Sequence, residues 1–397
     1  MKNKVLIEHF FGLVGQISAG LPLLLITSVI SMSDGLEAAG KFTVLVGLAS
    51  TIYSIGLWGF RPLIVINKYN LPSNLFLISR LFLLFISAII ILIFAVKMNY
   101  FIWFAYIIII IKSSDAIIDL DFGFLQLKSS YFALKSLATL HVSKFILIVL
   151  VLTLAHFSII NNFYLLIIIL GSLLFCVFIL KLIIQEKINF SLESINIQNI
   201  KQLFLKSTVF LFATVLCSFL TNSPRFLLDF FNDGELLGVI GICLSVANLF
   251  GMIFNTNWQR YFSNYKTQKN LSKYGLKFIF ENAFIAILLS IFVIFFLPYL
   301  VSLGFNINLI KYKDIMISVF LSYIVFNFGM SISNLYKLTQ KPIFESYTYL
   351  ITLILSAFLI LLFPSIFKIY HLLFIAGLVM LLLSTYSFKL FKTQNNE

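Results

Sequence analysis

Stretches of about 20 apolar residues, each long enough to cross a bilayer as one helix, follow one another along almost the whole sequence. Of the 397 residues, 61% are hydrophobic and only 11% are charged, and the mean hydropathy is +1.05. That composition excludes a soluble globular fold. We count twelve such stretches, at roughly 9–31, 38–60, 75–96, 100–121, 138–158, 162–184, 207–229, 236–257, 278–298, 314–336, 346–365 and 369–388. They consume most of the chain, so the sequence predicts an all-α polytopic membrane protein with twelve transmembrane helices and no separate soluble domain.

The basic residues predict how the chain is oriented in the membrane. The first apolar stretch is long enough to cross and has no small-residue cleavage site after it, so we expect an uncleaved first span. With both termini in the cytoplasm, the cytoplasmic side collects 21 of the 28 Lys and Arg residues, as the positive-inside rule requires. This rule, with attraction to anionic lipid headgroups, accounts for the net charge of +13, and no nucleic-acid partner is needed.

The cysteines and histidines predict neither a disulfide framework nor a metal site. All three cysteines fall within predicted spans, where a thiol behaves as a small apolar group. The four histidines are scattered without the spacing of metal ligands. We therefore expect no metal and no organic cofactor.

Two turn and charge features recur at an offset of 199 residues, about half the chain length. Asp34-Gly35 follows the first span and Asp233-Gly234 follows the seventh, while Arg61 ends the second span and Arg260 ends the eighth. With six spans on each side, this recurrence favours two tandem six-helix bundles of the same topology.

The predicted bundles are joined by the one long cytoplasmic loop. We place the N-terminal bundle at 1–185, the linker at 186–206 and the C-terminal bundle at 207–397. Apolar residues spaced among polar ones in the linker are typical of an amphipathic helix on the membrane surface, although an ordinary connector is equally compatible.

Charged residues interrupt the fourth predicted span. Lys112, Asp115 and Asp119 fall at i, i+3 and i+7 and therefore share one helix face, which cannot look at lipid because a charge there costs on the order of 3 kcal/mol. Either Lys112 and Asp115 form a local pair that helps helices pack, or they line a hydrated cavity in which Asp115 takes a proton or senses a cation. Asp121 is turned about 200° from Asp119, so we expect a solvated charge at the end of the span.

Two motifs resemble those of a known transporter family. Asp119-Leu-Asp-Phe-Gly123-Phe-Leu-Gln126 closes the fourth span and enters the basic loop, and Asn222-Ser-Pro-Arg225 ends the seventh span before an acidic outer turn. Both resemble the polysaccharide-exporting flippases of the MATE-like (MOP) superfamily, most closely the Wzx-type O-antigen flippases. One departure is that His141-Val142 stands where such proteins often place Arg-Gly, which makes His141 a candidate pH-sensitive substitute.

The resemblance implies a transporter and not an enzyme. Such a protein flips an undecaprenyl-diphosphate-linked oligosaccharide, the O-antigen repeat unit, from the inner to the outer leaflet of the bacterial inner membrane. It works by alternating access, and protons or Na⁺ are the coupling ions that this interpretation allows. The implied partners are the lipid-linked oligosaccharide, membrane lipids, and the polymerase and chain-length machinery.

The family plan also implies two groups of site residues. Spans one, two, seven and eight flank a central cleft in this family, so cations on them, with the motif glutamine, are candidate headgroup contacts: Lys41, Arg61, Arg225, Arg260 and Gln126. Candidates for coupling or gating are charged or titratable groups within the spans: Lys112, Asp115, Asp119, His141 and Glu281.

Each candidate has a simpler structural interpretation. Arg225 can form an i, i+4 pair with Asp229, and Arg61 and Arg260 can act as positive-inside anchors. Lys41 can snorkel to the outer interface, and Glu281 can make an interhelical hydrogen bond.

Two other functions remain open at this stage. A MATE-like multidrug or cation antiporter would use Asp115 or Asp119 against an organic cation and predicts a mainly acidic cleft. An O-antigen polymerase or glycosyltransferase needs a sizeable outer loop for its catalytic residues, and the longest outer connection, around 299–313, is too short for that role.

Overall fold

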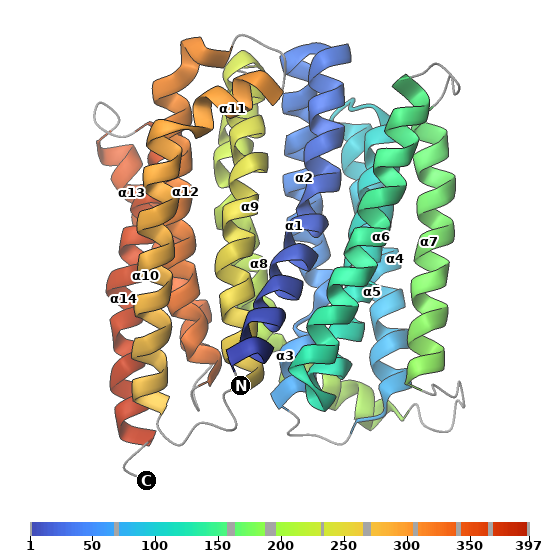
Figure 1. Cartoon of the computed structure of the whole chain (residues 1–397), viewed down its shortest axis with the longest axis vertical. Helices are drawn as coiled ribbons and strands as arrows, with labels where there is room; N and C mark the ends of the chain where they lie inside the picture. The colour runs from blue at the N-terminus through green and yellow to red at the C-terminus, as the bar shows by residue number, and fades with distance from the viewer. Residues whose placement is uncertain are drawn as a thin grey trace. The chain divides into compact units, whose positions relative to one another are not determined.

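A computed structural model describes residues 2–66, 71–156, 163–186, 196–231, 234–264, 271–304, 309–338, 343–363 and 368–394. Every regular element in these ranges is a helix (Figure 1). The long helices are α1 (Lys2–Ser33), α2 (Gly35–Leu57), α4 (Ser73–Lys97), α5 (Ile102–Lys128), α6 (Ser130–His156), α7 (Phe163–Gln185), α8 (Ile197–Phe230), α9 (Gly234–Asn264), α10 (Leu271–Phe295), α12 (Lys313–Ser333), α13 (Ile343–Leu362) and α14 (Leu372–Gln394). The short elements are α3 (Phe60–Ile66), α11 (Leu297–Gly304) and the 3₁₀ helices η3 (Leu309–Tyr312), η4 (Asn334–Leu338) and η5 (Ile369–His371).

Each of the twelve predicted spans corresponds to one of the long helices. Within the described residues, ten helical segments are long and apolar enough to cross a membrane, and an eleventh, at Ile369–Thr385, is shorter. The remaining long helix, α5, falls outside this set and carries the four charged residues of the interrupted span. The prediction of an all-helical, multi-pass membrane protein is confirmed.

The helices form two compact packing units. Unit 1 comprises Met1–Pro22 and Leu48–Val215, and unit 2 comprises Leu23–Gly47 and Leu216–Glu397. In unit 1, α5 packs against α3, α4, α6 and α7; in unit 2, α12 packs against α9, α10 and α14. The predicted bundle boundaries follow chain order and stay a prediction. Of the predicted linker, the structure describes residues 196–206 beyond Glu186, and from Ile197 they form the first turns of α8.

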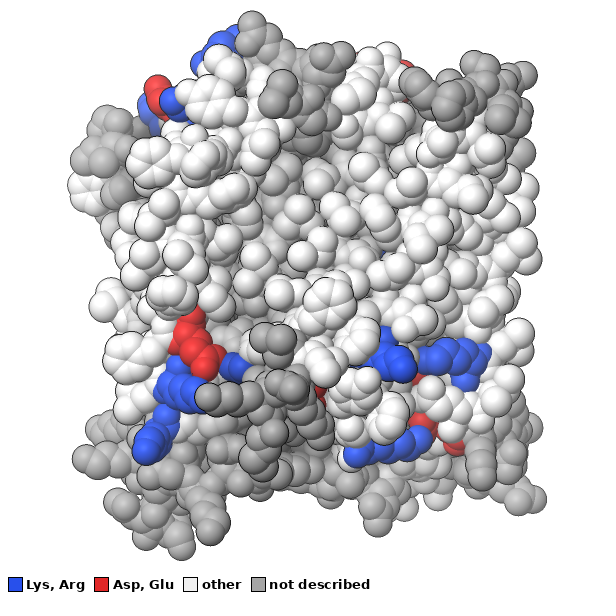
Figure 2. Space-filling view, in the orientation of Figure 1, with Lys and Arg blue, Asp and Glu red and all other residues white. Residues whose placement is uncertain are grey.

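The polarity of α13 is inverted relative to a helix of a soluble protein, which fits a lipid environment. In α13 every buried residue is polar, while exposed positions such as Ile354, Phe358 and Leu361 are apolar. The buried set is Glu345, Ser346, Thr348, Tyr349, Thr352 and Ser356. On the face drawn in Figure 2, most of the described surface is uncharged; the charged side chains seen there lie at the upper edge and in the lower part of the view, and the middle is nearly free of them.

A sharp break between α2 and α3 sets the direction in which Arg61 leaves the backbone. Trp58 and Gly59 both have positive φ, 42° and 63°, so the second predicted span ends one turn early and restarts as α3. A Cβ at Gly59 would lie 2.5 Å from Phe210 Cβ, so only glycine allows this close approach to α8 within unit 1.

Candidate functional site

The three carboxylates of α5 each contact a different set of basic residues within unit 1. Asp115 contacts Lys144 Nζ of α6, and its Oδ1 lies 3.6 Å from Nδ1 of His141 on the same helix. Lys144 and His141 are buried, whereas the Asp115 side chain is about one quarter exposed. Two of the five predicted coupling residues, Asp115 and His141, therefore meet at one point, and another, Lys112, is half-buried one turn earlier on α5. Lys144 was not among the predicted site residues.

Asp119 lies between two guanidinium groups. Its Oδ1 is 3.4 Å from Arg61 Nη1, and its Oδ2 is 3.6 Å from Arg80 Nη2 on α4. The Arg80 side chain is fully buried, Arg61 is 16% exposed and Asp119 is 26% exposed. Both guanidinium groups rest on aromatic rings, Arg61 over Phe122 at 4.3 Å and Arg80 over Phe60 at 5.2 Å.

The motif on α5 surrounds the side chain of Arg61. The helix does not give way to a loop after Asp121 as expected but continues to Lys128, so Asp119, Gly123 and Gln126 fall at i, i+4 and i+7 on one face. Asp119 pairs with the guanidinium, and Gln126 Oε1 accepts a 3.0 Å hydrogen bond from Arg61 Nε. A Cβ at Gly123 would lie 3.3 Å from Arg61 Cγ, so glycine leaves the room in which Arg61 crosses α5. The spacing of the motif thus places Asp119, Gly123 and Gln126 on one helix face, where together they accommodate the side chain of Arg61.

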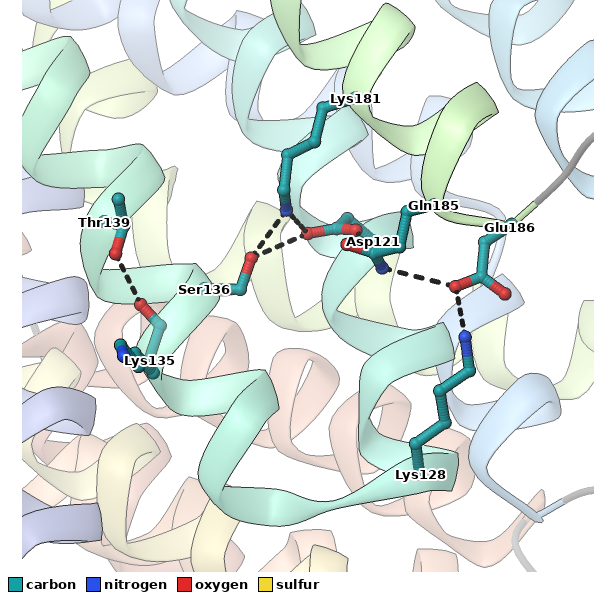
Figure 3. Close-up of polar contacts among 8 residues, drawn as sticks. All are labelled: Asp121, Lys128, Lys135, Ser136, Thr139, Lys181, Gln185 and Glu186. Atoms are coloured by element: carbon teal, nitrogen blue, oxygen red, sulfur yellow. Dashed lines mark hydrogen bonds and ion pairs between the residues drawn. The ribbon is translucent and has the colours of Figure 1, made fainter.

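The prediction that Asp121 is a solvated charge is wrong. Asp121 is 3% exposed, and its carboxylate accepts hydrogen bonds from Ser136 (3.0 Å), Lys181 (2.7 Å) and Gln185 (2.9 Å) (Figure 3). Lys181 Nζ also donates to Ser136 Oγ at 2.7 Å, which closes the network between α5, α6 and α7. The reason is packing: α6 and α7 both pack against α5 and supply Ser136, Lys181 and Gln185, so Asp121 lies in the protein interior.

Figure 3 also shows a second, more exposed pair beside this network. Lys128 Nζ lies 2.8 Å from Glu186 Oε1, and Gln185 donates to the same oxygen at 3.2 Å. Lys128 is 55% exposed, so this pair sits at the boundary of unit 1 and is weaker than the buried one.

Arg225 is buried in unit 2 and hydrogen bonds to neutral side chains. It is 1% exposed; Nη1 donates to Asn222 Oδ1, Nη2 is 3.4 Å from Ser245 Oγ, and Nε has no hydrogen-bond partner. Asn222 is held in place because its Nδ2 donates to Ser218 O at 2.8 Å. The alternative i, i+4 pairing with Asp229 is not among these contacts.

The other predicted residues of unit 2 form two separate ion pairs. Arg260 contacts Glu281 and donates to Asn257 Oδ1 at 2.9 Å, so a predicted headgroup contact and a predicted coupling residue are partners of one another. Lys41 lies 2.7 Å from Glu37 in an exposed i, i+4 pair. Lys41 is 46% exposed and contributes little to any buried site.

Comparisons with known proteins place the fold. No protein-family model matches the sequence, and no curated protein matches it. Among solved structures, the MATE multidrug transporter DinF-BH superposes with a TM-score of 0.73 at 16% identity, over 100% of this chain and 96% of that one. The chain has the MATE-like fold.

Two further structures with the MATE-like fold extend this result. The eukaryotic MATE transporter AtDTX14 superposes with a TM-score of 0.58 at 13% identity, over 100% of this chain and 97% of that one. A MOP superfamily transporter from Pyrococcus furiosus, described as having a binding pocket of reverse polarity, superposes with a TM-score of 0.61 at 13% identity, over 100% and 96%. At these identities the comparison establishes the MATE-like fold and leaves the cargo to be inferred from this chain's own residues.

Within the MATE-like fold, sequence reasoning missed two buried cations of unit 1. Arg80 and Lys144 were counted as basic residues of the cytoplasmic side, yet both are buried against α5. For each, the available signal was a cation inside a predicted apolar span, 75–96 and 138–158. The described residues contain no group of three or more His, Cys, Asp or Glu side chains that could hold a metal ion.

Proposed function

We propose that this chain is a MOP-type transporter that flips an undecaprenyl-diphosphate-linked oligosaccharide of the O-antigen repeat-unit kind. The cargo would move from the inner to the outer leaflet of a bacterial inner membrane by alternating access. The polymerase and chain-length machinery would then use it.

The observation that carries the proposal is Arg225. A guanidinium that is 1% exposed, with Asn222 and Ser245 as its hydrogen-bond partners, is a buried cation whose partners are neutral. Burying a charge without a counter-charge is costly, so such a residue is retained where a ligand supplies the opposite charge. A planar guanidinium matches a phosphate in bidentate geometry, and a diphosphate supplies that chemistry.

The MATE-like fold and the cargo's chemistry support the same proposal. A diphosphate sugar headgroup cannot cross hydrocarbon unaided, whereas a polyprenyl tail need not leave it. A polytopic helical protein with buried arginines can bind such a headgroup within its spans. The transporter names of the structural neighbours support a transporter of the MOP type, and the motif resemblance to Wzx-type flippases is what favours a lipid-linked sugar as the cargo.

Coupling to a proton or Na⁺ gradient belongs to the proposal as well. Asp115, with Lys144 and His141 against it, is a quarter-exposed carboxylate within a span, a position from which it can exchange a proton or cation. No step of headgroup binding depends on it.

The proposal is tested in a strain whose own O-antigen flippase is deleted. Accumulation of lipid-linked sugar on the inner leaflet should be relieved by this chain and not by Arg225→Gln. Lys311→Gln is the matched control, because Lys311 forms a 2.8 Å pair with Glu235 in which both side chains are 57% exposed. If Arg225→Gln exports lipid-linked sugar normally, and both variants are inserted in the membrane equally, Arg225 does not bind the headgroup.

A MATE-like cation antiporter is the second candidate, because the neighbours include multidrug transporters. It would use Asp115 or Asp119 against an organic cation. Two results together would favour the antiporter over the flippase. The wild type would export a cationic dye and Asp119→Asn would not, and the wild type would not change the distribution of lipid-linked sugar.

A further inference from the structure

Arg80 is the least satisfied charged side chain in the described part of unit 1. Its side chain is fully buried, and Nε, Nη1 and Nη2 all lack a hydrogen-bond partner. Its one ion-pair contact is Asp119 Oδ2 at 3.6 Å, beyond hydrogen-bonding distance. A buried guanidinium with no donor satisfied is an expensive arrangement that a purely structural role does not explain.

The neighbouring ion pair of Asp121 with Lys181 shows the geometry of a structural ion pair in this protein. Asp121, two residues away on α5, accepts hydrogen bonds at 2.7–3.0 Å from Lys181, Gln185 and Ser136. Asp119 contacts Arg61 and Arg80 at 3.4 and 3.6 Å instead. Both carboxylates belong to α5 and are two residues apart, yet only Asp121 has the short contacts of a structural ion pair.

We infer that Arg61 and Arg80 form a two-arginine site for a phosphate-type oxyanion, in which Asp119 is a resident counter-ion that the oxyanion displaces. The inference deepens the proposed function and rests on it for the identity of the cargo. Two guanidinium groups and one carboxylate carry a net charge of +1. An arriving oxyanion can therefore neutralise the excess positive charge as well as replace Asp119 as the counter-ion. Asp119 is 26% exposed and Arg61 16%, so an oxyanion can reach the Arg61–Asp119 contact before it reaches the fully buried Arg80.

The surroundings hold both arginines ready for this exchange. Gln126 fixes Arg61 through Nε, leaving the outer guanidinium nitrogens toward Asp119. The guanidinium carbons of Arg61 and Arg80 lie over the rings of Phe122 and Phe60, and these cation–π contacts do not depend on Asp119, so they persist when the carboxylate leaves.

The test measures binding of inorganic pyrophosphate to the full-length protein in nanodiscs of uncharged lipid. Asp119→Asn removes the competing carboxylate and should tighten binding by about tenfold. Adding Arg80→Gln to that variant should cancel the gain. Glu235→Gln is the matched control: it removes one carboxylate from an exposed pair with Lys311 and should leave pyrophosphate affinity unchanged.

Two outcomes overturn the site. Asp119→Asn could bind pyrophosphate no more tightly than wild type, or the gain could persist in the double variant. If Asp119→Asn fails to fold, the single variant Arg80→Gln tests the site. An oxyanion site predicts that Arg80→Gln binds pyrophosphate about tenfold more weakly than wild type, and that Arg80→Lys has an intermediate affinity. A purely structural Arg80–Asp119 pair predicts lower stability and unchanged pyrophosphate affinity.

Further arms identify the source of the oxyanion. Farnesyl diphosphate should compete with pyrophosphate and show the same dependence on Arg80. Dependence on Arg80 seen only with phosphatidylglycerol would assign the site to a bilayer lipid and overturn its role with the cargo. Arg80-dependent pyrophosphate binding in a protein that does not flip lipid-linked sugar would contradict the proposed function and leave the site standing.

Discussion

Replacing Asp121 with alanine should destabilise unit 1 by about 3 kcal/mol. The substitution removes the acceptor of three hydrogen bonds, from Ser136, Lys181 and Gln185, at 2.7–3.0 Å. Breaking a buried ion pair by removing one partner costs about 3–5 kcal/mol. We place the loss at the low end, because Lys181 is 35% exposed and the freed ammonium keeps its 2.7 Å bond to Ser136.

The assay is reversible unfolding in mixed detergent micelles, followed by circular dichroism. Lys128→Gln is the control, since Lys128 is 55% exposed in its pair with Glu186 and its loss should cost below about 1 kcal/mol. The reasoning is refuted if Asp121→Ala is no more destabilising than Lys128→Gln, because Asp121 would then behave as the solvated charge that sequence analysis expected.

Three further predictions concern packing around the charged residues. Gly59→Ala should lower the yield of folded protein, because φ is 63° and the new Cβ would meet Phe210 Cβ at 2.5 Å; normal yield would contradict this. Gly123→Leu should displace Arg61 and reduce transport of lipid-linked sugar, while Gly123→Ala, whose Cβ would lie 3.3 Å from Arg61 Cγ, should reduce it far less; equal effects would refute the role of this gap. Glu281→Gln should cost about 1–3 kcal/mol in the same unfolding assay and nothing further in the Arg260→Gln background, and additive costs would show that the two residues act separately.

The span pattern could be predicted because it depends on local composition. Twelve apolar stretches correspond to twelve long helices, since a bilayer demands about 20 apolar residues per crossing wherever the stretch falls in the chain. The end of the fourth span was less predictable. Hydropathy falls at Asp119, but the helix continues to Lys128 because α3, α6 and α7 cover its polar turns.

Ion-pair partners could not be predicted, because they depend on which helices pack together. Helical phase placed Lys112, Asp115 and Asp119 on one face, but it could not show that Arg61 and Arg80 lie against Asp119. Lys112 was the nearest cation in sequence to Asp115, whereas Lys144 and His141 reach it from α6. Arg80 stood within a predicted span, and that signal was outweighed by counting it with the cytoplasmic basic residues.

The central claim is that a buried arginine of this chain carries an anionic, lipid-linked headgroup across the membrane. The most direct measurement reconstitutes the purified protein into liposomes with a labelled undecaprenyl-diphosphate oligosaccharide and follows its accessibility to a glycosidase added outside. We expect wild type and Lys311→Gln to make the inner-leaflet pool accessible and Arg225→Gln to leave it inaccessible. Movement of the pool at the same rate by Arg225→Gln, or no movement by the wild type, would contradict the central claim.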